Sequence, residues 1–334
     1  MSGTVAKPKI YIDYISYARA IGKPVTNLGS QGFTGTIDFT YLFTLNPHKT
    51  TTLNSTPGTH NLNLAINEEA HGGASDPQLD YLFENANYWA ILGNNFDDLG
   101  ASPLLRGRSY TGSVGSSISA SQIDFETYNH DNIRFFSFDG LPNGYASGIQ
   151  LKFTGLGYGD NLRLGSFSMG RSFSFPHNAN LSMNIKYDQT GIKKKKTAGG
   201  RDIVDVQYYK SPDWDNRRAW DFSEFDNRTT GYVGRRSWDL TFSFLTKDDT
   251  FPVNMNEDYM FDQPTDGSTA VTHSTENITS HFMGLTLNGQ LPFIFQPDDT
   301  KAAMALCRLK SNSFSVQQSA PNLYTCKMSF EETW

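Results

Sequence analysis

The sequence has little cysteine and a small net charge. Its two Cys residues, Cys307 and Cys326, both lie in predicted strands near the C-terminus. Two Cys in 334 residues cannot form a disulfide scaffold. They could pair across neighbouring strands, but we favour buried free thiols, because a free Cys behaves as a small hydrophobe. The formal net charge of -6 argues against a dedicated nucleic-acid-binding protein, which would show a basic stripe.

Long hydrophobic runs are also missing. The longest strictly apolar stretches are short, such as Tyr88–Leu92, whereas a membrane-spanning helix needs about 20 apolar residues. The N-terminal segment Met1–Lys9 lacks the apolar core of a signal peptide. We therefore expect no membrane span, and a protein made in the cytoplasm that is soluble or becomes part of an assembly.

Motifs that carry chemistry are missing as well. The P-loop, G-x-S-x-G, H-E-x-x-H, S-x-x-K and C-x-x-C patterns do not occur. The seven His residues show no metal-ligand spacing, and Asn94–Asp98 offers oxygen ligands suited to Ca²⁺ without a complete loop signature. Carboxylate pairs such as Asp97–Asp98 are typical of solvated loops, although a polysaccharide hydrolase would also need two carboxyl groups. We expect no enzyme activity, no cofactor and no metal site.

The residues that are abundant point to β-structure. Aromatic residues make up 13% of the sequence, and they fit the pleated, half-buried surface of a sheet. Gly and Asn separate short alternating segments at intervals of about eight to twelve residues, a spacing typical of β-sandwiches. We predict an all-β fold of two sandwich-like, jelly-roll-type domains with long polar loops and little helix. The predicted divisions are an N-terminal strand or arm at 1–30, an N-terminal β-sandwich at 31–165 and a C-terminal β domain at 166–334.

Alternation of apolar and polar residues predicts the individual strands. In Ser237–Leu245 four apolar side chains fall on one face, those of Trp238, Leu240, Phe242 and Phe244. Other strands are predicted at Lys9–Tyr17, within Thr34–Thr44, and at Asn61–Ile66, Tyr88–Phe96, Ile118–Tyr128, Asn132–Phe138, Gly148–Phe153 and Leu181–Tyr187, with three more between Gly289 and Trp334. A short helix is predicted at Asp76–Glu84, and His281–Leu287 fits either a strand or a short helix.

Three long polar segments interrupt this pattern, at 46–77, 190–220 and 248–281. The second contains a run of lysines, formed by Lys193, Lys194, Lys195 and Lys196. Such a run is ordinarily a solvated loop, but in an assembling protein it can meet an acidic neighbour and steer docking. No stacking aromatic residues are interleaved with the lysines, which argues against nucleic acid as the partner.

Arg235 and Arg236 form a second candidate interface, at the start of a predicted strand. Arginine side chains form planar, bidentate pairs with carboxylates. Such a pair can lie within the chain, with its Asp-rich loops, or between subunits. We favour the pair within the chain. If the protein assembles, we expect the long polar loops to contact neighbouring subunits.

Five segments carry a further pattern. They are Asn87–Phe96, Gly170–Leu181, Asp188–Gly200 with Tyr208–Trp214, Gly234–Leu245, and a C-terminal set from Gly289 to Trp334 that contains Leu291-Pro-Phe-Ile-Phe-Gln-Pro-Asp298. Together these segments resemble structural proteins of marine tailed bacteriophages. Two positions depart from the family pattern, since Asn94 stands where His is common and Ser174 replaces an acidic residue.

The resemblance implies a virion structural protein of a phage tail, made in the cytoplasm of the host bacterium. The closing strands are similar to those of distal tail proteins, which form rings between the tail tube and the tip. The implied role is a homo-oligomeric ring component at the distal tail or baseplate that joins the tube to the tip or fibres. Its partners would be other tail proteins, of the tube, hub or fibre. The alternative is a glycan-binding β-sandwich module for host attachment, with sugars stacked on exposed rings such as Trp89, Trp214 and Trp220.

Overall fold

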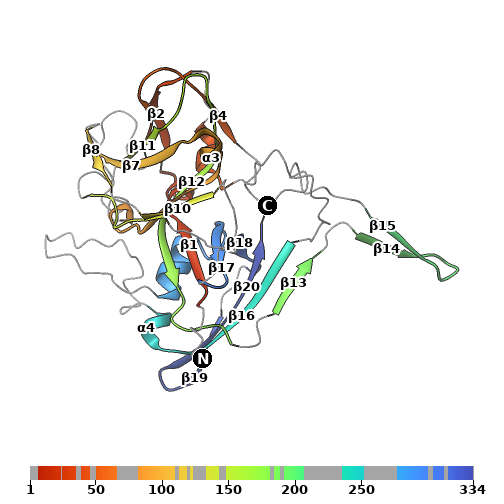
Figure 1. Ribbon diagram of the computed structural model, residues 1–334. Coiled ribbons are helices and arrows are strands. Elements are labelled where there is room, and N and C mark those ends of the chain that lie inside the picture. The colour runs from red at the N-terminus through yellow and green to blue at the C-terminus, as the bar shows by residue number, and fades with distance from the viewer. Residues whose placement is uncertain are drawn as a thin grey trace, which may run out of the picture.

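Antiparallel β-sheets dominate the structure, which confirms the predicted all-β class. The computed structural model describes residues 7–23, 25–34, 39–45, 50–65, 82–109, 113–118, 121–122, 133–142, 148–180, 184–188, 192–206, 235–251, 277–299, 304–311 and 315–333. Within these ranges the strands form a 13-stranded sheet, a 5-stranded sheet and a 2-stranded ribbon (Figure 1).

The 13-stranded sheet runs in the order β13-β16-β20-β18-β17-β1-β12-β6-β10-β9, with β4 paired to β12, β3 paired to β4, and β19 paired to β20. Its strands are β1 (Lys9–Asp13), β3 (Phe33–Thr34), β4 (Thr51–Ser55), β6 (Tyr88–Asn94), β9 (Ser121–Gln122), β10 (Ile133–Ser137), β12 (Asn161–Ser174), β13 (Asn184–Asp188), β16 (Arg235–Leu245), β17 (Phe293–Gln296), β18 (Ala305–Leu309), β19 (Ser315–Ala320) and β20 (Leu323–Glu332).

The 5-stranded sheet has the order β2-β5-β11-β7-β8. Its strands are β2 (Thr26–Gln31), β5 (His60–Ala65), β7 (Ser102–Arg108), β8 (Val114–Ser117) and β11 (Gly148–Thr154). The ribbon consists of β14 (Ile192–Lys196) and β15 (Asp202–Val206). The helical segments are short, namely α1 (Tyr14–Ala20), the 3-10 helix η1 (Phe39–Phe43), α3 (Phe96–Leu99), α4 (Lys247–Thr250) and the π-helix η2 (Ile278–Gly284).

Strand β1 joins the two halves of the large sheet. Its Ile10 lies opposite Phe173 of β12 on one side and opposite Phe295 of β17 on the other. Because β17 leads through β18 to the C-terminal strand β20, segments from both ends and the middle of the sequence form one sheet. The predicted boundary at residue 165 falls inside β12, and the division into 1–30, 31–165 and 166–334 stays a prediction.

Apolar side chains cover both faces of the central strands. Ile10 belongs to the main core, whereas the next residue, Tyr11, lies in a second buried cluster with Tyr88 and Phe135. The Tyr11 ring centroid is 5.1 Å from that of Tyr88 and 5.2 Å from that of Phe135. The main core also contains Leu151 of β11, so the 5-stranded sheet packs against the large sheet through it. Each fully buried side chain of this kind stabilises the fold by about 1.5–3 kcal/mol.

The strand predicted at Lys9–Tyr17 is wrong beyond Asp13, where helix α1 begins. One Asp13 oxygen caps this helix, accepting hydrogen bonds from the Ser16 N–H at 3.0 Å and from the Ser16 hydroxyl at 2.6 Å. The other oxygen accepts from the Ser168 hydroxyl at 3.1 Å and from the Met169 N–H at 3.2 Å. Burial raises the pKa of this carboxyl, although the hydrogen bonds act in the opposite direction. The cap redirects the backbone into a helix where alternation alone favours a strand.

Strand β16 confirms the strand predicted at Ser237–Leu245 but not the inward position of Phe244. The side chain of Phe242 is buried, whereas that of Phe244 is 72% exposed. Between Phe242 and Leu245 the register against β20 shifts, which marks a β-bulge. The bulge turns Leu245 into the core instead and leaves Phe244 at φ 63°. This is the left-handed region, which a bulky residue rarely adopts.

Within the polar segment at 46–77, β5 confirms the strand predicted at Asn61–Ile66 over its described part, whereas β4 lies where a loop was predicted. Thr51, Leu53 and Ser55 are buried and alternate with exposed residues along β4. Burial of this face therefore accounts for a strand in a Thr-rich segment. In the described part of Thr34–Thr44, where a strand was predicted, Thr34 ends β3 and Phe39–Phe43 form η1, and residues 35–38 lie outside the described residues. Leu82–Glu84, the described part of the helix predicted at Asp76–Glu84, is helical.

Near the C-terminus, η2 takes the helical alternative for His281–Leu287. The three strands expected after Gly289 are β17, β18 and β20, and the structure adds β19 before the last of them.

Candidate interaction surface

The lysine run lies in a ribbon that stands apart from the two larger sheets. These sheets and the helices that pack on them are called the body below. In Figure 1 the ribbon projects from the body at the right, and β14 and β15 pair with each other and with no other described strand. Lys193 lies opposite Asp205, Lys195 opposite Ile203, and Lys196 opposite Asp202. The interpretation of Lys193, Lys194, Lys195 and Lys196 as a loop or turn is therefore wrong, because they form a strand.

The tip of the ribbon is closed by a compact turn. The Thr197 N–H donates to the Arg201 carbonyl at 2.9 Å, and the Gly200 N–H donates to the Thr197 carbonyl at 2.9 Å. Gly200 has φ +82°, which glycine adopts without steric cost. The Thr197 hydroxyl donates to the Arg201 carbonyl at 3.1 Å and accepts from the Arg201 N–H at 3.0 Å. The turn is thus held by hydrogen bonds among its own residues.

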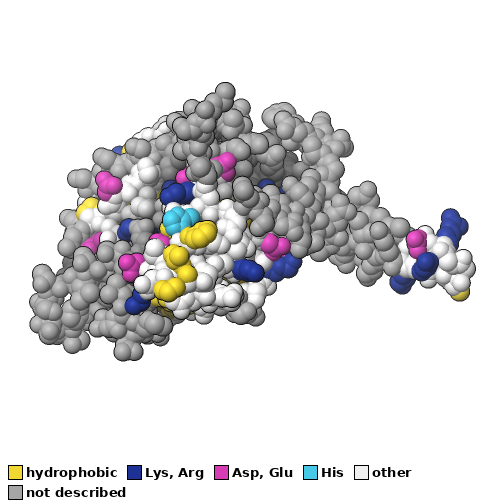
Figure 2. Space-filling model, turned by 90° about the horizontal axis from the view of Figure 1, so that it is seen from below, with side chains coloured by type: hydrophobic (Ala, Val, Ile, Leu, Met, Phe, Trp, Pro, Cys, Tyr) yellow, Lys and Arg dark blue, Asp and Glu magenta, His cyan; other side chains and the backbone are white. Residues whose placement is uncertain are grey.

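The ribbon has the opposite charge to the rest of the chain. Residues 192–206 contain five basic side chains and two acidic ones, a formal charge of +3. The remaining residues keep 23 basic and 32 acidic side chains, a formal charge of -9. Lys195, Lys196 and Arg201 are exposed, and Figure 2 shows Lys and Arg side chains on the ribbon where it extends from the body. A projecting basic element on an acidic protein fits a partner with a negative surface.

An isolated two-stranded ribbon is only marginally stable in water. Ile203 of β15 is 52% exposed although it is strongly apolar, so the ribbon leaves hydrophobic surface in solvent beside its charges. Exposed apolar surface at Ile203 beside the exposed Lys195 and Lys196 makes the ribbon a candidate interaction surface.

Arg236 is committed to an ion pair inside the chain. Its Nε donates to the Glu332 Oε2 at 3.1 Å and its Nη2 donates to the Glu332 Oε1 at 2.8 Å. The Arg236 backbone N–H also donates to this carboxylate, and the guanidinium lies 5.2 Å from the Trp238 ring centroid. The favoured pairing within the chain is confirmed for Arg236, with the C-terminal strand as partner instead of an Asp-rich loop. The backbone of Arg235 lies opposite Asp188, and its side chain is outside the described residues.

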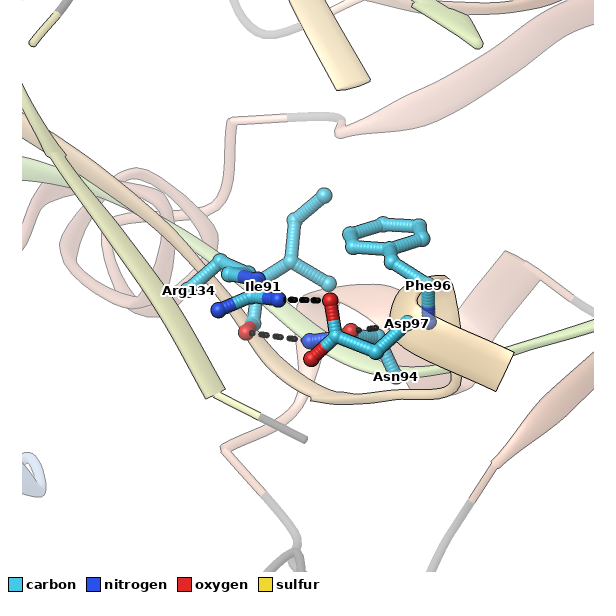
Figure 3. Close-up of polar contacts among 5 residues, drawn as sticks. All are labelled: Ile91, Asn94, Phe96, Asp97 and Arg134. Carbon is cyan, nitrogen blue, oxygen red and sulfur yellow. Dashed lines mark hydrogen bonds and ion pairs between the residues drawn. The ribbon is translucent and has the colours of Figure 1, made fainter. Parts of the chain in front are cut away.

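The Asn94–Asp98 segment, whose oxygens suggested Ca²⁺, uses its polar groups internally (Figure 3). The Asp97 carboxylate pairs with Arg134. The Asn94 side chain donates to the Ile91 carbonyl at 3.4 Å and accepts from the Phe96 N–H at 3.2 Å. Within the described ranges, no group of three or more His, Cys, Asp or Glu side chains is placed to hold a metal ion.

Cys307 and Cys326 are buried free thiols, which confirms the favoured interpretation. Cys307 lies opposite Phe293, and Cys326 lies opposite Phe242. Burial raises the pKa of Cys326 to about 12 and also raises the pKa of Cys307. Since the thiolate is the reactive form of cysteine, neither side chain is placed to act as a nucleophile.

Trp89 is buried and therefore does not offer a stacking surface for sugars. It is 1% exposed, and its ring stacks on Phe136 with centroids 4.0 Å apart and an interplanar angle of 10°. Trp214 and Trp220 lie outside the described residues. The exposed aromatic rings of the described chain are instead Tyr158 and Phe244. Figure 2, which views the end of the molecule opposite the 5-stranded sheet, also shows hydrophobic side chains gathered beside a histidine.

The sequence analysis did not predict two features, the β14–β15 ribbon and the exposure of Phe244. The ribbon carried a signal, because Asp202–Val206 is rich in β-branched residues and the turn before it contains Gly199 and Gly200. The exposure of Phe244 had no signal in the sequence, since its period-two position predicts burial.

No protein-family model matches the sequence, and comparisons with curated proteins and with solved structures find no match. No helix in the described part of the chain is long and apolar enough to span a membrane.

Proposed function

We propose that this protein is a structural subunit of a phage tail, acting as an oligomeric ring component at the distal tail or baseplate that joins the tube to the tip or fibres. The observation that carries the proposal is the projecting basic ribbon on an otherwise acidic chain. A ribbon without packing of its own is suited to docking on another subunit. The resemblance of the five sequence segments to phage structural proteins supplies the biological setting.

The proposed mechanism is assembly without bond chemistry. The body gives a scaffold of hydrogen-bonded strands, and the ribbon reaches a neighbour. Of the polar segments predicted to dock, 190–220 contains the ribbon and 248–281 contributes further contacts. The described part of 46–77 instead forms strands β4 and β5 within the sheets. Electrostatic attraction between the ribbon and an acidic neighbour speeds the encounter and fixes its orientation.

The alternative function is a glycan-binding module for host attachment. Tyr158, which is 80% exposed at the turn between β11 and β12, is the described ring that favours it. An aromatic ring in such a position can stack on the apolar face of a sugar. A glycan array with the wild-type protein and a Tyr158→Ala variant separates the two functions. Binding that is lost in the variant supports the glycan module, and the absence of binding supports assembly.

The test of the proposal is the presence and protection of this protein in purified virions. Mass spectrometry of virions is expected to detect the protein at the stoichiometry of a tail component. Trypsin is expected to cut free protein after Lys195, Lys196 and Arg201, which are exposed, and to leave these bonds intact in virions. Lys152, inside β11, is a reference bond that resists cleavage in both states. Virions that lack the protein would overturn the proposal. Equal cleavage in both states would show that the ribbon is not part of an interface in the virion.

A further inference from the structure

We infer that strand β19 of one copy pairs with β19 of a second copy, antiparallel and across a two-fold axis. The contact extends the 13-stranded sheet of one copy into that of the next. It does not involve the ribbon and does not rest on the proposed function. The partner is a second copy of this chain, and backbone hydrogen bonds recognise it.

The outer edge of β19 is open. One side of the strand pairs with β20, from Ser315 opposite Lys327 to Gln318 opposite Tyr324. On the other side no described strand pairs with it. Four of its six residues are exposed, and none is buried. Backbone N–H and C=O groups along this edge therefore face solvent, where another strand can pair with them.

The other edge strands of the described sheets are protected against such pairing, and β19 is not. Charged residues lie on β13 and on both strands of the ribbon, β3 and β9 have two residues each, β2 contains a bulge, and β8 has four residues. Charge, short length and bulges are ways in which natural sheets avoid edge-to-edge contacts. The six residues of β19 include no charge and no proline. Its register shift against β20, between Gln318 and Ala320, lies beside the hairpin turn and leaves Ser315–Gln318 regular.

The composition of β19 favours its own copy as the partner. Residues 315–320 consist of Ser, Val, Gln and Ala and carry no charge, so two copies of the strand meet without repulsion. Amide and hydroxyl side chains both donate and accept hydrogen bonds, so each can pair with an identical side chain. A charged strand cannot pair with itself in this way, because like charges directly opposite are destabilising. The same strand on a second copy therefore complements this edge in charge and in hydrogen bonding.

Geometry sets the register of the contact. Two residues directly opposite in an antiparallel pair either both bond to each other or both do not, so a strand that pairs with its own copy is centred on a residue and not between two. A centre at Gln317 keeps the regular segment Ser315–Gln318 within the paired region. Gln317 then lies opposite Gln317 of the second copy, and Val316 lies opposite Gln318 of the second copy.

The contact is weak in the isolated protein. A pair of six-residue strands is far smaller than the roughly 800 Å² per partner of a standard interface, so the dimer forms at high protein concentration. A two-fold contact closes on itself, so the pairing gives dimers and leaves any ring contact to other surfaces. Figure 1 shows β19 at the lower end of the molecule and the ribbon at the right, so one contact does not block the other.

Sedimentation equilibrium of the full chain tests the pairing. All samples carry Lys195→Glu/Lys196→Glu, so that the basic ribbon does not contribute, and this parent protein is expected to show a monomer–dimer equilibrium up to millimolar concentration. Gln317→Lys and Gln317→Glu each place like charges opposite each other at the two-fold axis and are expected to weaken the dimer about tenfold. Mixed in equal amounts, the two variants place opposite charges there and are expected to restore dimers to the level of the parent.

Asn54→Lys is the matched control, because Asn54 is an exposed amide on β4, which pairs with a strand on each side. This control is expected to dimerise as the parent does, and urea unfolding is expected to give the same midpoint for every variant. Disulfide formation under mild oxidation is a second measurement. Gln317→Cys is expected to form a covalent dimer, whereas Lys327→Cys, one strand away from the edge, is expected to remain monomeric.

Three results would overturn the inference: a parent that stays monomeric at every concentration, Gln317 variants that each dimerise as the parent does, or a mixture of these two variants that associates no better than either alone. None of these results touches the presence of the protein in virions, so failure of the inference and failure of the proposed function remain distinguishable.

Discussion

The body and the ribbon of this protein differ in what stabilises them. In the body, rings stack between strands, such as Phe175 on Phe242 with centroids 4.2 Å apart and an interplanar angle of 7°. In the ribbon, the described side chains of the strands and the tip are mostly exposed, and the two strands are held by each other and by the turn. Burial of apolar surface is the dominant favourable contribution to folding. The body therefore holds most of the stability of the protein, and the ribbon contributes little to it.

The largest effect on stability is expected at Phe242, in the core of β16. Phe242→Ala is expected to lower the free energy of unfolding by about 3–5 kcal/mol, because it leaves a cavity against Phe175. The matched variant is Phe244→Ala, two residues along the same strand, where the ring is 72% exposed. It is expected to change stability by no more than about 0.5 kcal/mol. Urea unfolding of both variants measures the difference, and equal losses would contradict the bulge that separates them.

The next effect concerns pH and His281 in η2. Burial, together with the charge of Arg171, lowers the pKa of this imidazole to about 3. The unfolded chain has an ordinary value of about 6.5, so between these values the unfolded state binds one proton more. The stability contribution is complete above pH 6.5 and is lost as the pH falls toward 3, by up to about 1.4 kcal/mol per pH unit.

His281→Phe tests this pH dependence. The new ring keeps the stacking on Phe173, whose centroid lies 5.9 Å from that of His281, and it cannot take up a proton. Between pH 6.5 and 5 the variant is expected to lose up to about 2 kcal/mol less stability than wild-type protein. Urea unfolding at both pH values measures the loss, and parallel losses would mean that His281 is not buried in its neutral form.

A smaller effect is expected from the backbone at Phe244. A non-glycine residue at φ 63° is strained. Phe244→Gly and Phe244→Ala both remove the exposed ring, but only glycine relieves the strain. The Gly variant is expected to be more stable than the Ala variant by about 1 kcal/mol. Thermal unfolding of the pair compares them, and a more stable Ala variant would show that the left-handed conformation is absent in solution.

The smallest effect on stability is expected in the ribbon. Lys195→Glu/Lys196→Glu is expected to change the free energy of unfolding of the body by less than about 0.5 kcal/mol, because both side chains are exposed. Its association with other copies, in contrast, is expected to weaken and to lose its salt dependence. Urea unfolding and sedimentation at two salt concentrations measure both properties. A large loss of stability would make the ribbon part of the core and not a docking element.

The sequence predicted the class of the fold and many strands because side-chain alternation is a local signal. β11 follows from it directly, whereas β6 was predicted as a buried strand from the apolar run Tyr88–Leu92. The thiols of Cys307 and Cys326 were predicted to be buried because a free Cys behaves as a small hydrophobe. The pairing of β1 with both β12 and β17 did not follow, because it joins segments far apart in the sequence. No local pattern of residues encodes such a contact.

The remaining misses have local physical causes. At Asp13 the side chain caps helix α1, so the strand that alternation predicted beyond this residue does not form. At Phe244 and Leu245 only one of two adjacent apolar side chains can point inward, and the bulge buries Leu245 and leaves Phe244 exposed. The lysine run has low strand propensity, so no strand was predicted there, although it forms one by pairing with Asp202–Val206. The conformation of the lysine run was therefore predicted wrongly, and its role as an interface stays a prediction.

Hydrogen exchange along the whole chain, in monomers held apart by high salt and in assemblies formed in low salt, tests the division between body and ribbon most directly. The amides of β1, β6 and β12 are expected to exchange slowly in both states, since these strands are paired on two sides. The amides of β14 and β15 are expected to exchange rapidly in the monomer and to become protected in the assembly. A ribbon that is already protected in the monomer, or that stays unprotected in the assembly, would contradict the proposal that it docks on another subunit.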